Sequence, residues 1–467
     1  MKQKRDIVSK REDYKRFIVF CLASLIILAQ AAVFAYVWYD FYRIRIDEPF
    51  WRRGNWVLIA IYALINTMFS RLYGGLKVGY LKRIDVFYSL TLATICTNVV
   101  VYFQVTLINR WFLEAKPMIS MTVVQLLLII IWIWGSRYIY SRLYRARKLL
   151  VIYGDRDPGD DLIHKMNSRR DKYDISGKVH IREGEERIHQ MMKEYEGVII
   201  WDLPSAVRNR YLKYCFAHSI RCYMSPKISD IILIGTDRIH LFDTPLLMSR
   251  NMGLSVEQRA AKRMLDILVS GLGLLILSPI MLIIALIVKL YDHGPVFYTQ
   301  SRLTCDGKEF MIYKFRSMRV DSEKNGARLA SKHDSRITPV GHVLRNLHLD
   351  ELPQLFNVFK GDMSLVGPRP ERTEIMQEYE KEIPEFYYRL KVKAGLTGYA
   401  QVYGKYNTTP YDKLKLDLFY IENYSFVLDI KLLFMTVKIF FQKEVSEGVD
   451  DKQKNALKDS TDERGKE

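Results

Sequence analysis

The residues best suited to chemistry are Asp350 and Glu351, two adjacent acids in the stretch HLDELPQLFNVFKGDMSLVGPRP, residues 348–370. Carboxylate oxygens are the ligands that Mg²⁺ prefers, and a carboxylate can also attack phosphorus to form an acyl phosphate. A metal ligand and a nucleophile are what phosphoryl transfer requires. The purely structural alternative is that Asp350 caps a helix and Glu351 complements the helix dipole.

Basic residues accompany this acidic pair, in a chain whose formal net charge is +18. Guanidinium groups match phosphate oxygens two at a time, so such a density of basic residues is typical of a diphosphate site. Anionic lipid headgroups would attract the same side chains. The residues concerned are Arg302, Lys314, Arg316, Arg319, Arg336 and Arg345.

An amphipathic helix must position the acidic pair. Apolar side chains recur at i, i+3, i+4 and i+7 over residues 352–359, which predicts one helix over residues 351–360. Pro353 is tolerated in the first turn of such a helix, and Gly361 is expected to end it. Asp350 would then lie near the N-cap.

Four long apolar blocks occupy the first third of the chain, at residues 17–39, 56–69, 86–108 and 118–135. About 20 apolar residues cross a bilayer core, so these blocks predict a transmembrane domain with four spans over residues 1–147. Lys and Arg are concentrated before the first block, between the second and third, and after the fourth. These three segments are therefore expected on the cytoplasmic side of the membrane.

Residues 148–250 have a different pattern, in which short apolar runs alternate with polar helical stretches. This alternation predicts a Rossmann-like α/β module with a small parallel sheet. A dinucleotide site requires Gly-x-Gly-x-x-Gly after the first strand, whereas this chain places Asp155 where a side chain would block the pyrophosphate. We therefore expect a module without a nucleotide.

The third segment opens with an apolar run over residues 264–290 that is interrupted at Ser278 and Pro279. Proline removes a backbone donor and clashes with the preceding turn, so the helix must bend there. Basic residues flank both ends of the run, which predicts a re-entrant membrane helix hairpin; a kinked spanning helix is the alternative. Residues 425–443 predict a helix in the interface plane, and the charged residues 444–467 predict a disordered tail.

Several motifs occur in one order along residues 258–441: AAKRMLDILVS, the Ser278-Pro279 break, YKFRSM, LDELPQLFNVFKGDMSLVGPRP and GLTGYAQVYGKY. Together they resemble the bacterial polyprenyl-phosphate hexose-1-phosphate transferases, which start capsule, exopolysaccharide and O-antigen repeat units. The resemblance implies a phosphoglycosyl transferase that moves a hexose-1-phosphate, glucose or galactose by default, from a UDP-sugar to undecaprenyl phosphate and releases UMP. It places the catalytic domain at residues 258–443.

The resemblance also implies roles for single residues. Asp350 would be the nucleophile that carries the sugar phosphate, and Glu351 would bind Mg²⁺ together with it. Arg369, between Pro368 and Pro370, would face the nucleotide or its phosphates. The remaining implied contacts are with phosphates, of the lipid for Lys262 and Arg263 and of either substrate for Lys314, Arg316 and Arg345. Relatives commonly have Pro at position 394, so Ala394 is expected to loosen the turn before Leu396.

The expected fold is therefore a multi-domain membrane protein with an α-helical transmembrane bundle, a Rossmann-like α/β module and an α+β catalytic domain with a re-entrant membrane helix hairpin. We expect it in the bacterial cytoplasmic (inner) membrane as a multi-pass protein, with the catalytic domain on the cytoplasmic face. The module could mediate a homodimer, and no nucleic-acid partner is expected. Two other functions stay open: a membrane-bound NAD(P)-dependent sugar-nucleotide epimerase or dehydratase, and a noncatalytic scaffold of polysaccharide assembly.

Overall fold

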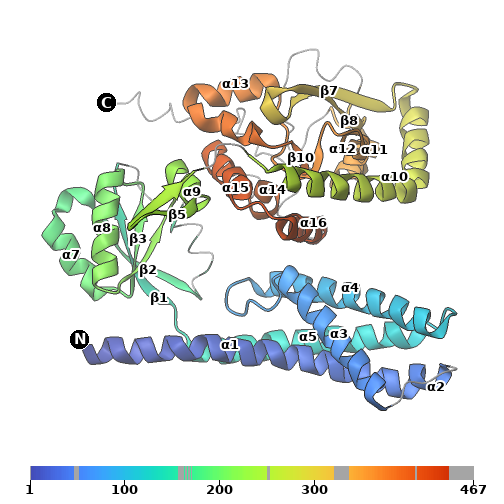
Figure 1. Cartoon of the computed structure of the whole chain (residues 1–467), viewed down its shortest axis with the longest axis horizontal. Helices are drawn as coiled ribbons and strands as arrows, with labels where there is room; N and C mark the ends of the chain where they lie inside the picture. Colours follow the sequence, from blue (N-terminus) through green and yellow to red (C-terminus); the bar gives the residue numbers. More distant parts are fainter. Residues whose placement is uncertain are drawn as a thin grey trace. The chain divides into compact units, whose positions relative to one another are not determined.

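The computed structural model describes residues 2–46, 52–155, 162–163, 166, 169, 171–249, 253–319, 336–404 and 408–440. The chain divides into two compact units, Met1–Pro226 and Lys227–Glu467. Figure 1 follows the sequence from the blue helices of the first unit to the red helices late in the second. The tail predicted at residues 444–467 lies outside the described residues.

Long helices build the N-terminal part of the first unit, in the places where the four apolar blocks predicted them. Within the described residues, five helices are long and apolar enough to cross a membrane, and four of these belong to this unit. The chain therefore has the character of a membrane protein. The helices are α1 (Lys2–Val37), which continues through a π-helical turn (Trp38–Tyr42) into α2 (Arg43–Arg45), then α3 (Arg52–Leu72), α4 (Arg83–Asn109) and α5 (Lys116–Leu143).

Buried polar side chains connect the four long helices. The amide nitrogen of Gln125 in α5 donates to the Tyr62 hydroxyl of α3 at 2.7 Å and to the backbone carbonyl of Gln30 in α1 at 3.2 Å. Asn98 of α4 donates to Oε1 of Gln125 at 2.8 Å and accepts from the Tyr62 hydroxyl at 3.1 Å. Lipid offers no partners for such groups, so these bonds fix how the four helices align along one another.

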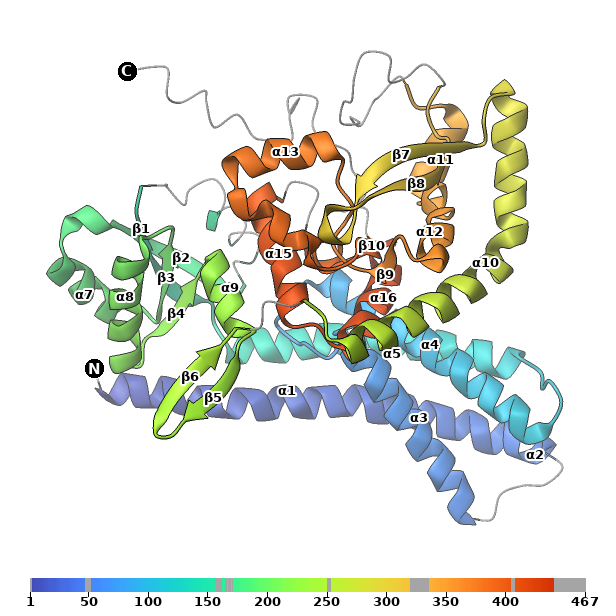
Figure 2. The ribbon, with the colours of Figure 1, turned by 45° about the horizontal axis from the view of Figure 1, so that its top comes forward.

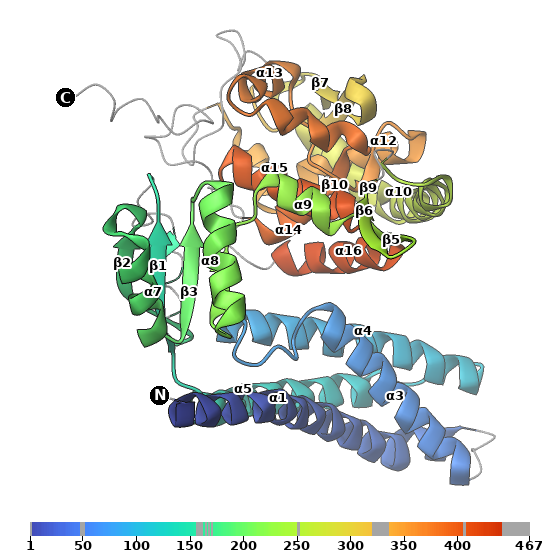
Figure 3. The ribbon, with the colours of Figure 1, turned by 60° about the vertical axis from the view of Figure 1, so that its left-hand side comes forward.

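A four-stranded parallel sheet with the order β2-β1-β3-β4 follows the bundle, as predicted for a Rossmann-like module. One face of the sheet packs against α7 and α8, and residues 162 and 166 contribute to the apolar cover of the other face. Figure 3 shows the strands beside these two helices. The elements are β1 (Arg147–Tyr153), β2 (Tyr173–His180), a 3-10 turn (Ile181–Glu183), α7 (Glu185–Glu194), β3 (Gly197–Trp201), α8 (Ser205–Ala217) and β4 (Arg221–Met224).

The second unit begins before the predicted end of that module. The sequence assigned residues 227–250 to the module, but the described residues 227–249 of this stretch contain α9 (Ile228–Ile234) and an antiparallel hairpin of β5 (Asp237–Leu241) and β6 (Thr244–Met248). Helix α9 packs on the second unit through Ile228 and Ile231, which belong to the largest buried cluster of that unit. The apolar pattern alone did not reveal which core these residues join.

The rest of this unit combines the long helix α10 with short strands and helices around two buried apolar clusters. Strands β7 and β8 pair antiparallel, and β9 and β10 pair parallel. The elements are α10 (Val256–Asp292), β7 (Phe297–Leu303), a 3-10 turn (Cys305–Gly307), β8 (Glu309–Phe315), α11 (Pro339–Asn346), a 3-10 turn (Leu349–Glu351), α12 (Gln354–Lys360), β9 (Ser364–Val366), α13 (Thr373–Glu382), a 3-10 helix (Pro384–Lys391), β10 (Gly395–Thr397), α14 (Tyr399–Tyr403), α15 (Pro410–Glu422) and α16 (Phe426–Phe440).

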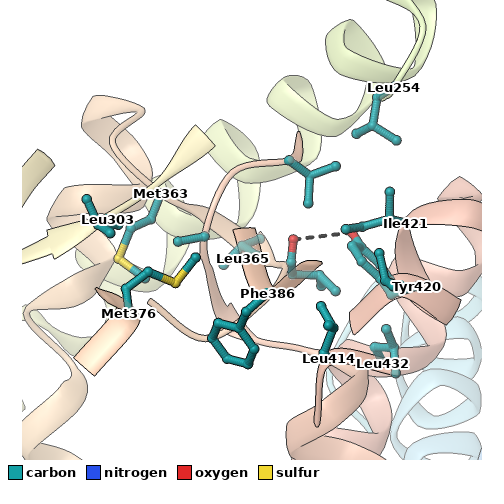
Figure 4. Close-up of a cluster of buried hydrophobic side chains, with 14 of the residues drawn as sticks. Leu254, Leu303, Met363, Leu365, Met376, Phe386, Leu414, Tyr420, Ile421 and Leu432 are labelled. Carbon is teal, nitrogen blue, oxygen red and sulfur yellow. Dashed lines mark hydrogen bonds between the residues drawn. The ribbon is translucent and has the colours of Figure 1, made fainter. Parts of the chain in front are cut away.

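The core of the second unit joins β9 to the helices that follow it. Figure 4 shows Leu365, Phe386, Leu414 and Leu432 among its buried side chains. The Tyr420 hydroxyl also reaches this core and lies 3.3 Å from the carbonyl oxygen of Val366, to which it can donate. The same hydroxyl proton can be donated to Oδ1 of Asp429 at the shorter distance of 2.7 Å, so apolar packing is what joins helix α15 to β9.

Helix α10 bends along its length, as Figure 2 shows. Pro279 lies inside the helix, and the Ser278 hydroxyl donates to the carbonyl of Leu275 at 2.8 Å, so the predicted break is the site of the bend. The helical backbone continues through all 37 residues, so the structure has one bent helix where the sequence predicted a re-entrant helix hairpin or a kinked spanning helix. Only 17% of its most apolar stretch is buried inside the protein, which suits a helix that lies in lipid.

Candidate active site

The acidic pair lies on a tight turn between α11 and α12. His348 has a φ of 53°, in the left-handed region, and the 3-10 turn Leu349–Glu351 follows it directly. Helix α12 begins only at Gln354, with Pro353 in the N-cap position, so the predicted start at residue 351 is wrong. The predicted end is confirmed, because Gly361 has a φ of 103°. Both acids therefore lie on a 3-10 turn before the helix and not within its first turn.

The Asp350 side chain is buried and lacks hydrogen-bond partners among the described residues. Its exposed fraction is 7%, and no hydrogen bond joins its carboxylate to another residue that the structure describes. Burial raises the pKa of Asp350 above its ordinary value, although Lys314 and Arg345 act in the opposite direction. A carboxylate that is desolvated and has no hydrogen-bond donor is a stronger nucleophile than one in water.

Glu351 is held by two cations. Its Oε1 accepts from the Lys314 ammonium at 2.7 Å and from Nη2 of Arg369 at 3.0 Å. Burial opposes ionisation, but the charges of Lys314 and Arg369 outweigh it and keep the pKa of Glu351 well below its usual range. Glu351 is thus an anion at neutral pH, and it brings together two of the phosphate-binding residues that the sequence predicted.

The acidic pair fits Mg²⁺ only in part. Mg²⁺ is bound in many sites by one or two carboxylates, with substrate phosphates and water completing an octahedron. Asp350 and Glu351 supply two such carboxylates, whereas no group of three metal-ligating side chains exists among the residues described. The donor set therefore does not form a closed protein site, and a Mg²⁺ ion there would need phosphate oxygens from a substrate.

Asn357, which sequence reasoning missed, aligns β8 with α12. Its side chain is fully buried; Oδ1 accepts from the backbone nitrogen of Tyr313 at 3.0 Å, and Nδ2 donates to the carbonyl of Met311 at 2.7 Å. These bonds fix the strand that carries Lys314 against the helix that follows Glu351. No spacing in the sequence indicates this role, because the two partners lie more than forty positions away.

We expect Asn357→Ala to destabilise the protein by about 3 kcal/mol, because the variant leaves a buried donor and a buried acceptor of β8 without partners. Thermal unfolding in detergent checks this value. Asn423→Ala is the matched control, since that exposed amide only bonds the carbonyl of Phe419 within its own helix end. Equal shifts in Tm for the two variants would contradict the assignment.

Arg316 and Arg345 have protein partners in the structure. The guanidinium of Arg316 pairs with the carboxylate of Asp292 at the end of α10. Nε of Arg345 donates to the Ser317 hydroxyl at 3.0 Å. Arg345 also contributes positive charge near Asp350. Of these two predicted phosphate contacts, Arg345 thus acts on the acidic pair, whereas the guanidinium of Arg316 is engaged by Asp292.

Lys262 and Arg263 fasten α10 to the rest of the unit. The Lys262 ammonium is 5% exposed and bonds Oδ2 of Asp429 at 2.6 Å and the Tyr420 hydroxyl at 2.9 Å. Arg263 donates to the carbonyls of Val358 and Phe359, both at 2.7 Å, at the end of α12. Both side chains thus meet protein groups where the sequence predicted a lipid phosphate. Arg263 caps the helix that follows the acidic pair.

Backbone carbonyls hold the loop of Pro368, Arg369 and Pro370, which we call the Pro-Arg-Pro loop. The two prolines have no N–H to donate, so the loop is tied through its oxygens. The Pro368 carbonyl accepts from the nitrogen of Gly395 at 2.9 Å, and the Pro370 carbonyl accepts from Arg302 at 3.2 Å. Arg369 is thereby presented to Glu351 from a fixed backbone.

The turn at Ala394 is held at both of its backbone groups, so the looser turn predicted from the missing proline is wrong. The nitrogen of Ala394 donates to the Thr304 hydroxyl at 3.1 Å, and its carbonyl accepts from the nitrogen of Ser364 at 2.8 Å. A proline at this position could not make the first bond. The hydrogen bond from Ala394 to Thr304 therefore restrains the turn that a proline ring would otherwise restrain.

Glu371, at the end of the Pro-Arg-Pro loop, makes a pH-dependent contribution to stability. Burial would raise its pKa, but Lys413 and Arg389 outweigh burial and lower the pKa to about 2 from an ordinary 4.5. A carboxyl whose pKa is lower in the folded state stabilises the fold above the unfolded pKa and loses that contribution as pH falls from 4.5 towards 2. The full contribution is about 3 kcal/mol.

We therefore expect the Tm of the wild-type protein to fall more steeply between pH 7 and about pH 3 than the Tm of Glu371→Gln, which starts lower at pH 7. Thermal scans at several pH values measure the difference. Glu374→Gln, at an exposed site nearby, should follow the wild type. A Glu371→Gln profile parallel to the wild-type profile would exclude this origin of acid sensitivity.

Comparison with known proteins gives matches that fall mainly on the second unit. Residues 257–443 match the bacterial sugar transferase family. The chain is 39% identical over 232 residues to the UDP-N-acetylgalactosamine-undecaprenyl-phosphate N-acetylgalactosaminephosphotransferase of Aeromonas hydrophila, a match that covers 49% of this chain and 54% of that protein. It is 42% identical over 208 residues to the UDP-glucose:undecaprenyl-phosphate glucose-1-phosphate transferase of Klebsiella pneumoniae, covering 44% and 43% of the two chains.

A shorter relative is matched over most of its length. The chain is 47% identical over 131 residues to the putative undecaprenyl-phosphate N-acetylgalactosaminyl 1-phosphate transferase of Bacillus subtilis (strain 168), which covers 28% of this chain and 73% of that protein. The chain spans about half the length of the two longer relatives. The matched residues include the acidic pair, the Pro-Arg-Pro loop and Lys314. With these residues and this similarity, the chain belongs to the bacterial sugar transferase family.

Proposed function

We propose that this protein transfers a hexose-1-phosphate from a UDP-sugar to undecaprenyl phosphate, giving undecaprenyl-diphospho-sugar and UMP. This reaction would begin the assembly of a polysaccharide repeat unit, as in an exopolysaccharide, a capsule or an O-antigen. Its donor is a soluble sugar nucleotide and its acceptor is a membrane lipid, so the proposal also accounts for an α+β unit that carries a long apolar helix.

The observation that carries the proposal is the contrast between the two adjacent acids. Asp350 is buried and has no hydrogen-bond partner among the described residues, whereas Glu351 is ionised and held by Lys314 and Arg369. Two neighbouring carboxylates with such different surroundings are suited to different roles. Asp350 is suited to attack, and Glu351 is suited to organise positive charge around a phosphate.

The proposed reaction takes two displacements at one phosphorus. An oxygen of Asp350 first attacks the phosphorus that bears the sugar; the new bond forms as the bond from that phosphorus to the bridging oxygen breaks, and UMP leaves with that oxygen. A phosphate oxygen of the lipid then attacks the same phosphorus and releases the Asp350 carboxylate. The protein ends in its starting state, and no oxidant, reductant or net proton is required.

Positive charge must stabilise both displacements. Lys314 and Arg369 meet at one oxygen of Glu351, so they place two cations next to the nucleophile before substrate arrives. Arg369 projects from a loop whose carbonyls are tied, which suits it for the diphosphate or the departing UMP. Asp350 and Glu351 would hold Mg²⁺, which would neutralise phosphate charge when bound.

The membrane position follows from the two substrates. UDP-sugars are cytosolic, so the proposal places the second unit on the cytoplasmic face, with α10 as a re-entrant helix that enters and leaves the same side. The acceptor phosphate lies at the headgroup level of the membrane. The bend at Pro279 and the apolar, exposed side chains of α10 support this arrangement.

The donor sugar has several candidates. Glucose and galactose are the sugars that the sequence resemblance implies, while the two longer relatives are named for N-acetylgalactosamine and glucose. A panel of UDP-glucose, UDP-galactose and their N-acetylated counterparts therefore covers the candidates.

The test is UMP release by the full chain in nanodiscs, with undecaprenyl phosphate, Mg²⁺ and each UDP-sugar in turn. Turnover with one sugar, dependent on the lipid, supports the transferase. Without the lipid, at most one UMP per protein should appear, together with a sugar-phosphate adduct on the chain detectable by intact mass. No UMP from any sugar would reject the proposal and leave a noncatalytic scaffold or a different sugar-nucleotide enzyme.

A further inference from the structure

A buried arginine, Arg389, lies under the Pro-Arg-Pro loop. Its side chain is 1% exposed, and Nη2 donates to the backbone carbonyl of Arg369 at 3.0 Å. Nη2 also lies 2.7 Å from Oδ2 of Asp417, and Nη1 lies 3.4 Å from Oε1 of Glu371. One guanidinium therefore contacts the middle of the loop, its end and helix α15 at the same time.

The contacts of this arginine lead directly to the acidic pair. Arg389 holds the carbonyl of Arg369, and the side chain of Arg369 reaches Oε1 of Glu351 at 3.0 Å. The Arg369 side chain is 44% exposed, so packing does not hold its outer end. Its position is set instead by its backbone, and thus by the group that holds its carbonyl.

The buried charges fit this task. Asp417 is also 1% exposed, and it receives both Nε of Arg389 at 3.0 Å and Nη2. A planar fork with donors in fixed directions can satisfy Asp417, Glu371 and the Arg369 carbonyl together, whereas a lysine at the same place could not. Breaking such a buried pair would cost stability, so the pair must be removed as a whole.

We propose that Arg389, oriented by Asp417 and Glu371, is the positioning residue that sets Arg369 for the reaction at the acidic pair. It acts through Arg369 and does not itself contact the substrate. This inference rests on the proposed function, and it adds a residue that lies outside the Asp-Glu and Pro-Arg-Pro motifs and makes no contact with either acid.

A double-mutant cycle tests the inference in the full chain in nanodiscs. The neutral replacement Arg389→Gln with Asp417→Asn is compared with the wild type, and the same replacement is compared within Arg369→Ala. We expect the replacement to lower kcat/KM for UMP release about 10- to 100-fold in the wild type, and by no more than about twofold when Arg369 is already absent. Equal losses in the two backgrounds would overturn the inference, because a general loss of folded protein acts equally in both.

Lys415→Met provides a matched control. Lys415 lies on the same helix as Asp417, is also buried, and pairs with Asp412 one turn before it. Its removal therefore takes a buried charge and the ion pair with Asp412 from α15, and it leaves the ion pair of Arg389 with Asp417 in place. We expect any loss of kcat/KM in this variant to be the same with and without Arg369.

Hydrogen exchange over residues 364–376 provides a readout that needs no activity. The neutral replacement should raise exchange in this segment about tenfold or more, while Lys415→Met leaves it unchanged. Absence of UMP release by the wild type would reject the proposed function, and the exchange measurement would then decide the inference alone. If the neutral replacement left hydrogen exchange over residues 364–376 unchanged, Arg389 would not hold the Pro-Arg-Pro loop, and the inference would be wrong.

Discussion

Asp350→Asn is expected to lower lipid-dependent UMP release by about 10⁴-fold or more, because the amide keeps the shape of the side chain but cannot act as the nucleophile. The variant should also lose the single UMP released without lipid and the sugar-phosphate adduct. Asp350 is buried and makes no hydrogen bond to another described residue, so the substitution breaks no hydrogen bond within the described part of the chain. Tm should therefore change little while activity disappears.

The control for this variant is Asp306→Asn. Asp306 is exposed on the turn between β7 and β8 and has a φ of 59°, a conformation that asparagine adopts readily. Its replacement should leave UMP release unchanged. Release that survives Asp350→Asn at more than about one-hundredth of the wild-type rate would reject the covalent mechanism, although a direct transfer between the two substrates would remain compatible with the family.

Glu351→Gln is expected to lower kcat/KM by about 10²- to 10³-fold and to raise the Mg²⁺ concentration needed for half-maximal activity. The amide keeps one oxygen for Lys314 and Arg369 but removes the negative charge that holds them together. Their mutual repulsion is then uncompensated, and the distance between the two cations should increase. Mg²⁺ titrations at UDP-sugar concentrations from well below KM up to saturation measure both effects.

Two comparisons separate this effect from a general loss of charge. Glu374→Gln removes an exposed carboxylate from α13 and should be neutral in the same titration. Lys314→Met should have a smaller effect in Glu351→Gln than in the wild type, because the ion pair at 2.7 Å is already lost. A Glu351→Gln variant with an unchanged Mg²⁺ requirement would separate Glu351 from the metal and leave it only the role of holding the two cations.

The local elements of the chain follow from its sequence because their causes are local. Hydropathy over about 20 residues predicts the long helices of the bundle and α10, and alternating short runs predict the parallel sheet. Gly361 ends α12 because its φ of 103° is unfavourable for other residues, and Pro279 marks the bend of α10 because it lacks a donor. The start of α12 was misplaced by three residues, since apolar periodicity does not distinguish a 3-10 turn from the first turn of a helix.

The sequence by itself thus determined the long apolar helices, the parallel sheet, the candidate acids and the family resemblance. Only the tertiary structure decided which charges meet. Lys262 pairs with Asp429, 167 positions away, and Glu351 gathers Lys314 and Arg369 from 37 positions before it and 18 after it. No sequence pattern indicated a role for Arg389, whose partner Asp417 lies on α15. Basic residues look alike along a chain, and the packing of distant elements determines whether each one is buried against a carboxylate or left facing a substrate.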